Sequence, residues 1–365
     1  MKKRFAALIL IFSIIASISL SLVSCGEKYE PVESTAEEKR TVMTISYDGE
    51  KYKVPYELYR AFFLQLKPVV DGGNADVWTG ENKDEYVTRI DEMILHRISE
   101  IYAVFHLCEK ADIDVYSTDF ENQIKEHIEI AVEGGMLNNT VYEGFDGNYD
   151  KYLASLKEMN LNYSTQVLLL RYQIAYETLA SHYIGDLSDD SLKVGDIEYT
   201  KDDVREFYLD EDASVRVILA QLDNTYFTKE RALAIRNTIA SKTSDTDVAN
   251  YIAGFTLSSP TSEVIGKYTY DEFYYSDLTE SVFSLDVGET GAVITLKTDV
   301  FDGYVIAYRV EATDAFFEDN YEEIKASYLY DVFGRAVADA RSGIARAATA
   351  TDELKVLDRS SVKMG

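Results

Sequence analysis

Alternating and helically spaced apolar positions divide the chain into its expected elements. Residues 41–54 alternate on both sides of Asp48-Gly49, a dipeptide typical of a two-residue hairpin turn, and therefore predict two short strands. Pro55 then begins a helical pattern. Further patterns with apolar side chains three and four residues apart lie at residues 82–111, 117–134, 149–159 and 164–183. The part of the chain before residue 212 is therefore expected to be mainly helical.

The spacing changes to that of a strand at "SVRVILAQL", residues 214–222. Val215, Val217 and Leu219 alternate with residues of the opposite face, which predicts a half-buried strand. Helical patterns at residues 229–241 and 245–254 follow, then a loop and further strands, and residues 316–348 return to helix. In the tail, "ELKVLDRSSV" is expected to add an edge strand beside the hairpin of residues 41–54.

Two helices carry recognisable start signals. Ser117 or Thr118 is a suitable N-cap for the helix that ends near Gly134-Gly135. Thr200, followed three residues later by Asp203, predicts a helix that leads into the strand at residue 214.

The first residues have the pattern of an export signal. A basic start, Lys2-Lys3-Arg4, precedes an uncharged apolar run over residues 5–23, which ends in Leu22-Val23-Ser24-Cys25. This ending resembles a bacterial lipobox, and the resemblance implies cleavage before Cys25 and a diacylglyceryl group on its sulfur. A plain secretory signal and an uncleaved anchor helix are the alternatives. Residues 26–40 are polar and aperiodic, which predicts a flexible tether.

Composition limits the classes of function. With 365 residues and 46% hydrophobic content, the chain is long enough for about two domains and is not disordered throughout. Loss of the three basic leader residues brings the formal charge from −28 to −31, which excludes nucleic-acid binding. The 28 tyrosines indicate amphipathic packing or, alternatively, an adaptable surface for polypeptides. Cys108 has no partner for an intramolecular disulfide and is expected to be a small buried hydrophobe.

Motifs for metal or hydrolytic chemistry are incomplete. The acids of residues 186–196 lack the full ligand spacing of a calcium loop, and zinc lacks paired His or Cys ligands. The sequence has no G-x-S-x-G elbow and no glycine-rich phosphate loop. A catalytic carboxylate pair stays open, because any acidic chain contains candidates. We therefore expect no metal and no cofactor.

Several segments, in order, resemble the SurA/PrsA group of extracytoplasmic foldases. "NLNYSTQVLLLRYQIAYETL" is similar to the helix that closes their helical chaperone region, and "YTKDDVREFYLDEDASVRVIL" to the linker helix and first strand of their parvulin-type prolyl isomerase domain. "DVANYIAGFTLS", "VIGKYTYDEF" and "SVFSLDVGETGAVITLKTDVFDGYVIAYRV" resemble successive parts of that domain, including Gly288 and Gly303. The resemblance covers about residues 41–348.

The two histidines that the resemblance implies for a parvulin cleft are absent. Val217 follows the arginine of the first strand, and Val305 follows Gly303-Tyr304 of the last strand, where the family has histidine. The histidines of this chain, His96, His106, His127 and His182, all precede the parvulin-like segment. Valine has no hydrogen-bonding group, so we expect the cleft to have lost its isomerase chemistry.

The predicted fold class is α+β, a helical chaperone module whose N- and C-terminal segments pack together around an inserted parvulin-like α/β domain. The expected divisions are a signal peptide (1–24), a tether (25–40), a SurA-N-like helical region (41–212), the parvulin-like domain (213–312) and a C-terminal helix and tail (313–365). Candidate cleft or client-binding residues are Leu219, Phe273, Phe283, Thr295, Thr298 and Tyr304.

The expected function is a chaperone or foldase that is lipid-anchored at Cys25 on the extracytoplasmic face of a bacterial membrane and binds unfolded secreted proteins. One alternative is an active prolyl isomerase that uses polar residues such as Thr295, Thr298 or Ser258. The other is an assembly lipoprotein with one dedicated partner.

Overall fold

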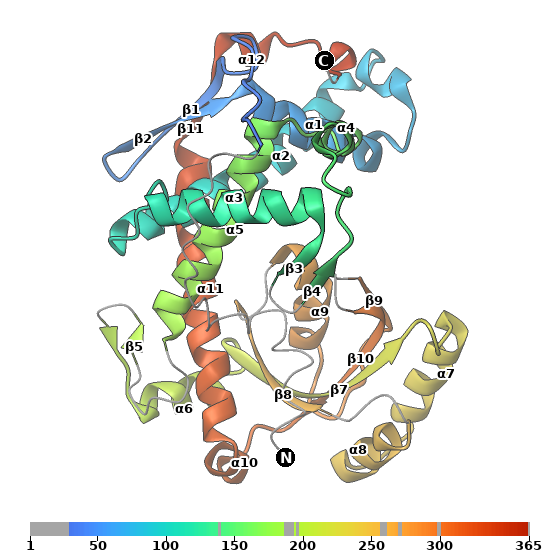
Figure 1. Ribbon diagram of the computed structural model, residues 1–365. Helices are drawn as coiled ribbons and strands as arrows, with labels where there is room; N and C mark the ends of the chain where they lie inside the picture. Colours follow the sequence, from blue (N-terminus) through green and yellow to red (C-terminus); the bar gives the residue numbers. More distant parts are fainter. Residues whose placement is uncertain are drawn as a thin grey trace. The chain divides into compact units, whose positions relative to one another are not determined.

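The computed structural model describes residues 29–137, 140–185, 193–194, 197–255, 261–268, 272–297 and 301–363, and the chain forms two compact units (Figure 1). Unit 1 comprises Met1–Leu179 and Val337–Gly365, and unit 2 comprises Ala180–Ala336. Two long helices, α5 (Tyr163–Ile184) and α11 (Tyr321–Ala347), contribute to both units. The α+β class predicted from the sequence is confirmed, whereas the insertion of residues 213–312 as a domain of its own stays a prediction.

The three-stranded sheet of unit 1 has the strand order β11-β1-β2. The predicted hairpin is present as β1 (Thr41–Tyr47) and β2 (Glu50–Pro55), with Asp48 at φ 49° and Gly49 at φ 87° in its turn. The other edge of β1 pairs with β11 (Ala348–Ala350), in which Ala350 lies opposite Met43.

The edge strand predicted for residues 353–362 was wrong, because strand pairing ends upstream of them. Thr351 donates its backbone N–H to the Val42 carbonyl, and its hydroxyl caps a short helix by accepting from the N–H of Leu354. This cap turns the chain away from the sheet. The tail therefore forms α12 (Asp352–Lys355) and the 3-10 helix η3 (Arg359–Ser361).

Helices make up most of unit 1, and their starts follow local signals. Ser117 caps α3 by accepting from the N–H of Phe120, and Gly134 ends that helix, both as predicted. The first helix continues through Pro68 and ends at Gly72, which adopts a left-handed conformation at φ 57°. The elements after the hairpin are α1 (Tyr56–Asp71), η2 (Ala75–Trp78), α2 (Lys83–Lys110), α3 (Thr118–Glu133), β3 (Gly135–Leu137), β4 (Thr140–Tyr142) and α4 (Tyr149–Glu158).

The segment predicted as a flexible tether is held against unit 1 over its described part. The Ser34 hydroxyl donates to the Glu57 carboxylate of α1 at 2.5 Å, and its oxygen lies within hydrogen-bonding distance of the Ser164 hydroxyl of α5, at 2.8 Å. Arg40 lies with its guanidinium carbon 4.2 Å from the centre of the Tyr56 ring. The tether prediction was therefore wrong for residues 29–40, because polar composition does not reveal hydrogen-bond partners that lie far away in the chain.

Unit 2 contains an antiparallel sheet with the strand order β8-β7-β10-β9. Thr200 and Asp203 form the predicted capping box at the start of the helix that precedes this sheet. The helix predicted over residues 316–348 is interrupted at Asn320, which ends one helix before the next begins. The elements are β5 (Lys193–Val194), β6 (Ile197–Glu198), α6 (Lys201–Leu209), β7 (Ser214–Asp223), α7 (Lys229–Ile239), α8 (Asp245–Ala253), β8 (Thr261–Gly266), α9 (Glu272–Phe283), β9 (Ile294–Lys297), β10 (Asp302–Val310) and α10 (Asp314–Asp319).

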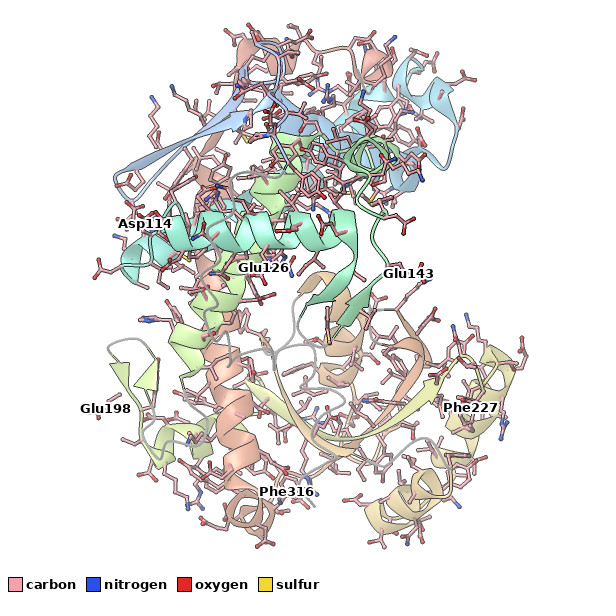
Figure 2. All side chains as sticks on the ribbon, in the orientation of Figure 1. Asp114, Glu126, Glu143, Glu198, Phe227 and Phe316 are labelled. Atoms are coloured by element: carbon pink, nitrogen blue, oxygen red, sulfur yellow. The ribbon has the colours of Figure 1, made fainter. Side chains whose placement is uncertain are left out.

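Strand β7 is buried on both faces, so the expectation of a half-buried strand was wrong. Ile218, Ala220 and Leu222 pack into a core with side chains of α7 and α8. Phe227, labelled in Figure 2, joins this core. Figure 1 shows α9 on the other side of the sheet, where it contacts β7, β9 and β10. A central strand of a sheet that helices cover on both sides has apolar residues on both faces, so apolar and polar positions do not simply alternate along it.

Candidate functional site

The two valines at the expected histidine positions lie on one face of the unit 2 sheet. In the antiparallel register, Val217 lies opposite Arg309 and Val305 lies opposite Gln221. Because directly opposed residues share a face and side chains alternate along a strand, Val217, Leu219 and Val305 all point to the side of α9. Val217 and Leu219 are 0% exposed and Val305 is 2% exposed. The three side chains are therefore buried, with Arg309 and Gln221 beside them on the same face.

Two further candidate cleft residues, Thr295 and Tyr304, do not share that face. Thr295 and Tyr304 lie opposite each other in β9 and β10, and Tyr304 packs against the core formed with α7 and α8. Phe283 is half-buried at the end of α9. The sheet therefore separates Thr295 and Tyr304 from Leu219. Cys25, Ser258 and Thr298, as well as the side chain of Phe273, lie outside the described part of the structure.

The polar group beside Val217 has a structural role. Arg309 is buried, and its guanidinium donates to the Leu285 carbonyl at 2.5 Å and to the Glu211 carboxylate at 2.6 Å. These bonds connect β10 to the end of α9 and to the chain before β7. No histidine follows His182 in the sequence, so β7 to β10 contribute no imidazole that could polarise a peptide bond.

Unit 1 contains a cavity of about 310 Å³ between its hairpin and helices. Leu58, Val167 and Leu168 form part of an apolar wall, while Glu57 and Arg171 bring charge to the same space. Cavities that combine apolar walls with a few polar groups are the usual form of a ligand site. The lining residues are Lys53, Pro55, Glu57, Leu58, Tyr102, Ser164, Thr165, Val167, Leu168 and Arg171.

Two of the three charged residues that line the cavity, Glu57 and Arg171, are engaged by neighbours within unit 1, and the third, Lys53, is exposed. The Glu57 carboxylate accepts hydrogen bonds from the Ser34 hydroxyl and, at 2.8 Å, from the Asn162 amide. Arg171 donates to the Val115 carbonyl at 2.7 Å and to Glu121 at 2.6 Å. These bonds hold the two charged side chains against unit 1 and leave the apolar wall as the other part of the lining.

Sequence reasoning missed this cavity because its lining comes from β2, α1, α2 and α5, which are far apart in the chain. Each of these residues has an ordinary place in a local pattern. The only available signal was the resemblance of the residues around Ser164 to the helix of a chaperone region, which did not point to individual side chains.

Other kinds of site have no support in the described residues. Among them, no group of three or more His, Cys, Asp or Glu side chains is arranged to hold a metal ion. None of the described helices combines the length and apolarity needed to cross a bilayer. Cys108 is a buried free thiol, as predicted, and burial raises its pKa to about 12, which makes it unreactive at neutral pH.

Comparisons with known proteins give similarity to solved structures of foldases. No family model matches the sequence, and no curated protein matches it. Foldase protein PrsA from Streptococcus pneumoniae str. Canada MDR_19A is 14% identical, with 72% of this chain and 87% of that chain covered and a TM-score of 0.29. PrsA from Bacillus subtilis is 14% identical over 89% of this chain and 98% of that chain, with a TM-score of 0.24. Foldase protein PrsA from Lactococcus lactis is 12% identical, with 89% of this chain and 100% of that chain covered and a TM-score of 0.24. These scores are too low to carry a functional assignment, which we therefore build from the chain's own residues.

Proposed function

We propose that this protein is a chaperone of unfolded secreted polypeptides, lipid-anchored at Cys25 on the extracytoplasmic face of a bacterial membrane, and that it does not isomerise prolyl bonds. The observation that carries the proposal is the burial of Val217 and Val305 beneath α9. The segment resembles a prolyl isomerase domain, but buried valines stand at both positions where that family has histidine. This supports a protein that binds polypeptides and does not catalyse isomerisation.

The cavity of unit 1 is the proposed client site. Its apolar wall, which includes Val167 and Leu168, offers a surface to the apolar side chains that an unfolded chain exposes. Burial of apolar surface contributes about 25 cal/mol per Å², so a few side chains suffice for the weak, reversible binding that a chaperone needs.

The test combines an aggregation assay with a protease-free peptide isomerisation assay on the full-length protein. Leu168→Glu places a charge in the apolar wall of the cavity and is expected to weaken suppression of client aggregation at least several-fold. Leu233→Glu is the matched control, because Leu233 is an exposed leucine of α7 (46% exposed) outside the cavity. We expect it to behave as the unmodified protein does.

Two results would change this assignment. Saturable acceleration of prolyl isomerisation by the unmodified protein would favour the active isomerase. Absence of any effect in both assays would favour an assembly protein that serves one dedicated partner.

A further inference from the structure

The hairpin formed by β3 and β4 exposes apolar side chains to solvent. Met136 and Val141 lie directly opposite each other in this antiparallel pair, and Tyr142 follows Val141. Their exposed fractions are 64%, 75% and 45%, respectively. A small hairpin gains little from apolar residues that face water, so this cluster indicates a surface that another apolar phase covers.

At the base of the hairpin, the segment that enters β3 and the segment that leaves β4 are in close backbone contact. Gly134 and Gly144 adopt positive φ angles of 82° and 64°, and a Cβ on either would collide with the backbone of the other segment. The N–H of Phe145 also donates to the Val132 carbonyl at 2.7 Å. The hairpin therefore projects from a defined position at the end of α3.

The N-terminal segment begins at that same position. The Tyr29 hydroxyl donates to Glu133, the last residue of α3, at 2.7 Å. The Tyr29 ring stacks on Tyr149 with 5.0 Å between ring centres, and the Tyr149 hydroxyl donates to the Glu30 carbonyl at 2.9 Å. The chain that comes from Cys25 thus meets the folded unit next to the hairpin base.

Chain length then limits the distance between lipid and hairpin. Cys25 precedes Tyr29 by four residues, and a fully extended chain spans at most about 3.5 Å per residue, so the two are separated by no more than roughly 14 Å. Each three-residue strand of the hairpin extends about 10 Å from its base. A lipid on Cys25 and the side chains of Met136 and Val141 can therefore reach the same bilayer surface.

We propose that the β3–β4 hairpin is a membrane-contacting element whose Met136 and Val141 enter the interfacial layer of the bilayer that holds the Cys25 lipid. The proposal rests on the lipid anchor of the proposed function. Tyr142 suits this layer, since its ring is apolar and its hydroxyl can remain among the headgroups. Glu133, Glu143 (labelled in Figure 2) and Asp146 flank the hairpin in the sequence. Residues 133–150 contain no lysine or arginine. The contact is consequently apolar and insensitive to salt.

The experiment uses the full-length lipidated protein in phosphatidylcholine vesicles, with a spin label attached at Val141→Cys. Val356→Cys is the matched control, because Val356 is an 82% exposed valine of the tail in the same unit. Cys108 is 0% exposed and does not compete for the label. We expect the label at position 141 to collide several-fold more with oxygen than with a water-soluble nickel chelate, at low and at high salt. The control label is expected to favour the chelate.

Measurement of labelled palmitate on the same preparation separates the lipid anchor at Cys25 from the hairpin contact with the membrane. If Cys25 carries lipid but the nickel chelate reaches the labels at positions 141 and 356 equally, the proposed hairpin contact is wrong. The lipid anchor at Cys25 is then still supported. Shielding of position 141 only after addition of an unfolded client would overturn the hairpin contact in favour of client binding. Absence of lipid on Cys25 would overturn the anchor and, with it, the hairpin contact.

Discussion

Arg60 and Glu38 form an ion pair at 2.8 Å that fastens the N-terminal segment to α1. The Arg60 side chain is 7% exposed and that of Glu38 is 19% exposed. Although burial raises the pKa of Glu38, hydrogen bonds from Thr35, Arg60 and Asn162 outweigh it and lower this pKa from 4.5 to about 2. The carboxylate is therefore stabilised in its charged form in the folded protein.

Replacement of Arg60 is expected to destabilise unit 1. Arg60→Gln should lower the free energy of unfolding by about 1 to 2 kcal/mol, less than for a fully buried pair because Glu38 keeps some contact with water. Urea denaturation at neutral pH measures the change. Lys39→Gln is the control, since Lys39 pairs with the exposed Glu33 on the surface, and no measurable change is expected.

The same pair predicts a pH dependence of stability. Since the pKa of Glu38 is lower in the folded than in the unfolded chain, its contribution is present above pH 4.5 and is lost as the pH falls from 4.5 towards 2. Thermal melting between these pH values should show a smaller loss for Arg60→Gln than for the unmodified protein. An identical pH dependence of the two would contradict the assigned role of Glu38.

The tail is expected to stabilise unit 1 through Arg359. Its guanidinium donates to Asp91 of α2 at 2.7 Å and to the Leu354 carbonyl at 2.7 Å, and the side chain is 5% exposed. Arg359→Ala removes these bonds and should cost about 3 kcal/mol. Lys355→Ala, which removes an exposed ion pair with Asp352, should change stability by less than about 0.5 kcal/mol. Equal effects of the two variants in urea denaturation would contradict this role of the tail.

Cys25→Ser is expected to abolish lipid attachment. The serine hydroxyl is a far weaker nucleophile than a thiolate, so the diacylglyceryl group has no site of transfer. Labelling of cells with palmitate, followed by isolation of the protein, measures the loss, and fractionation should find the variant outside the membrane. Palmitate retained on the variant would show that Cys25 is not the attachment site.

Histidines at positions 217 and 305 are not expected to create isomerase activity. Val217→His with Val305→His buries two polar rings in a packed core, which should cost about 1 to 3 kcal/mol or more in stability. X-Pro isomerisation takes tens to hundreds of seconds without a catalyst, so even weak acceleration is visible in a peptide assay. Recovery of activity by the folded double variant would show that the face beneath α9 opens to substrate.

Features that depend on a few neighbouring residues were predictable from the sequence. The turn at Asp48-Gly49, the caps at Ser117 and Thr200 and most helix bounds follow from backbone preferences and hydrogen bonds within one turn of chain. The absence of histidine after His182 is likewise a property of the sequence itself.

Only the tertiary structure decided which faces and edges of these elements are buried and which distant segments bury them. Strand β7 is buried on both faces because α7, α8 and α9, which follow it in the chain, pack against the two sides of the sheet. The edge of β1 is paired by Ala348–Ala350, which carries no strand signal of its own. Ser34 and Glu38 are held by Glu57, Arg60 and Asn162, partners that lie up to 128 residues away. Such contacts depend on the shape of the folded chain, which local spacing does not encode.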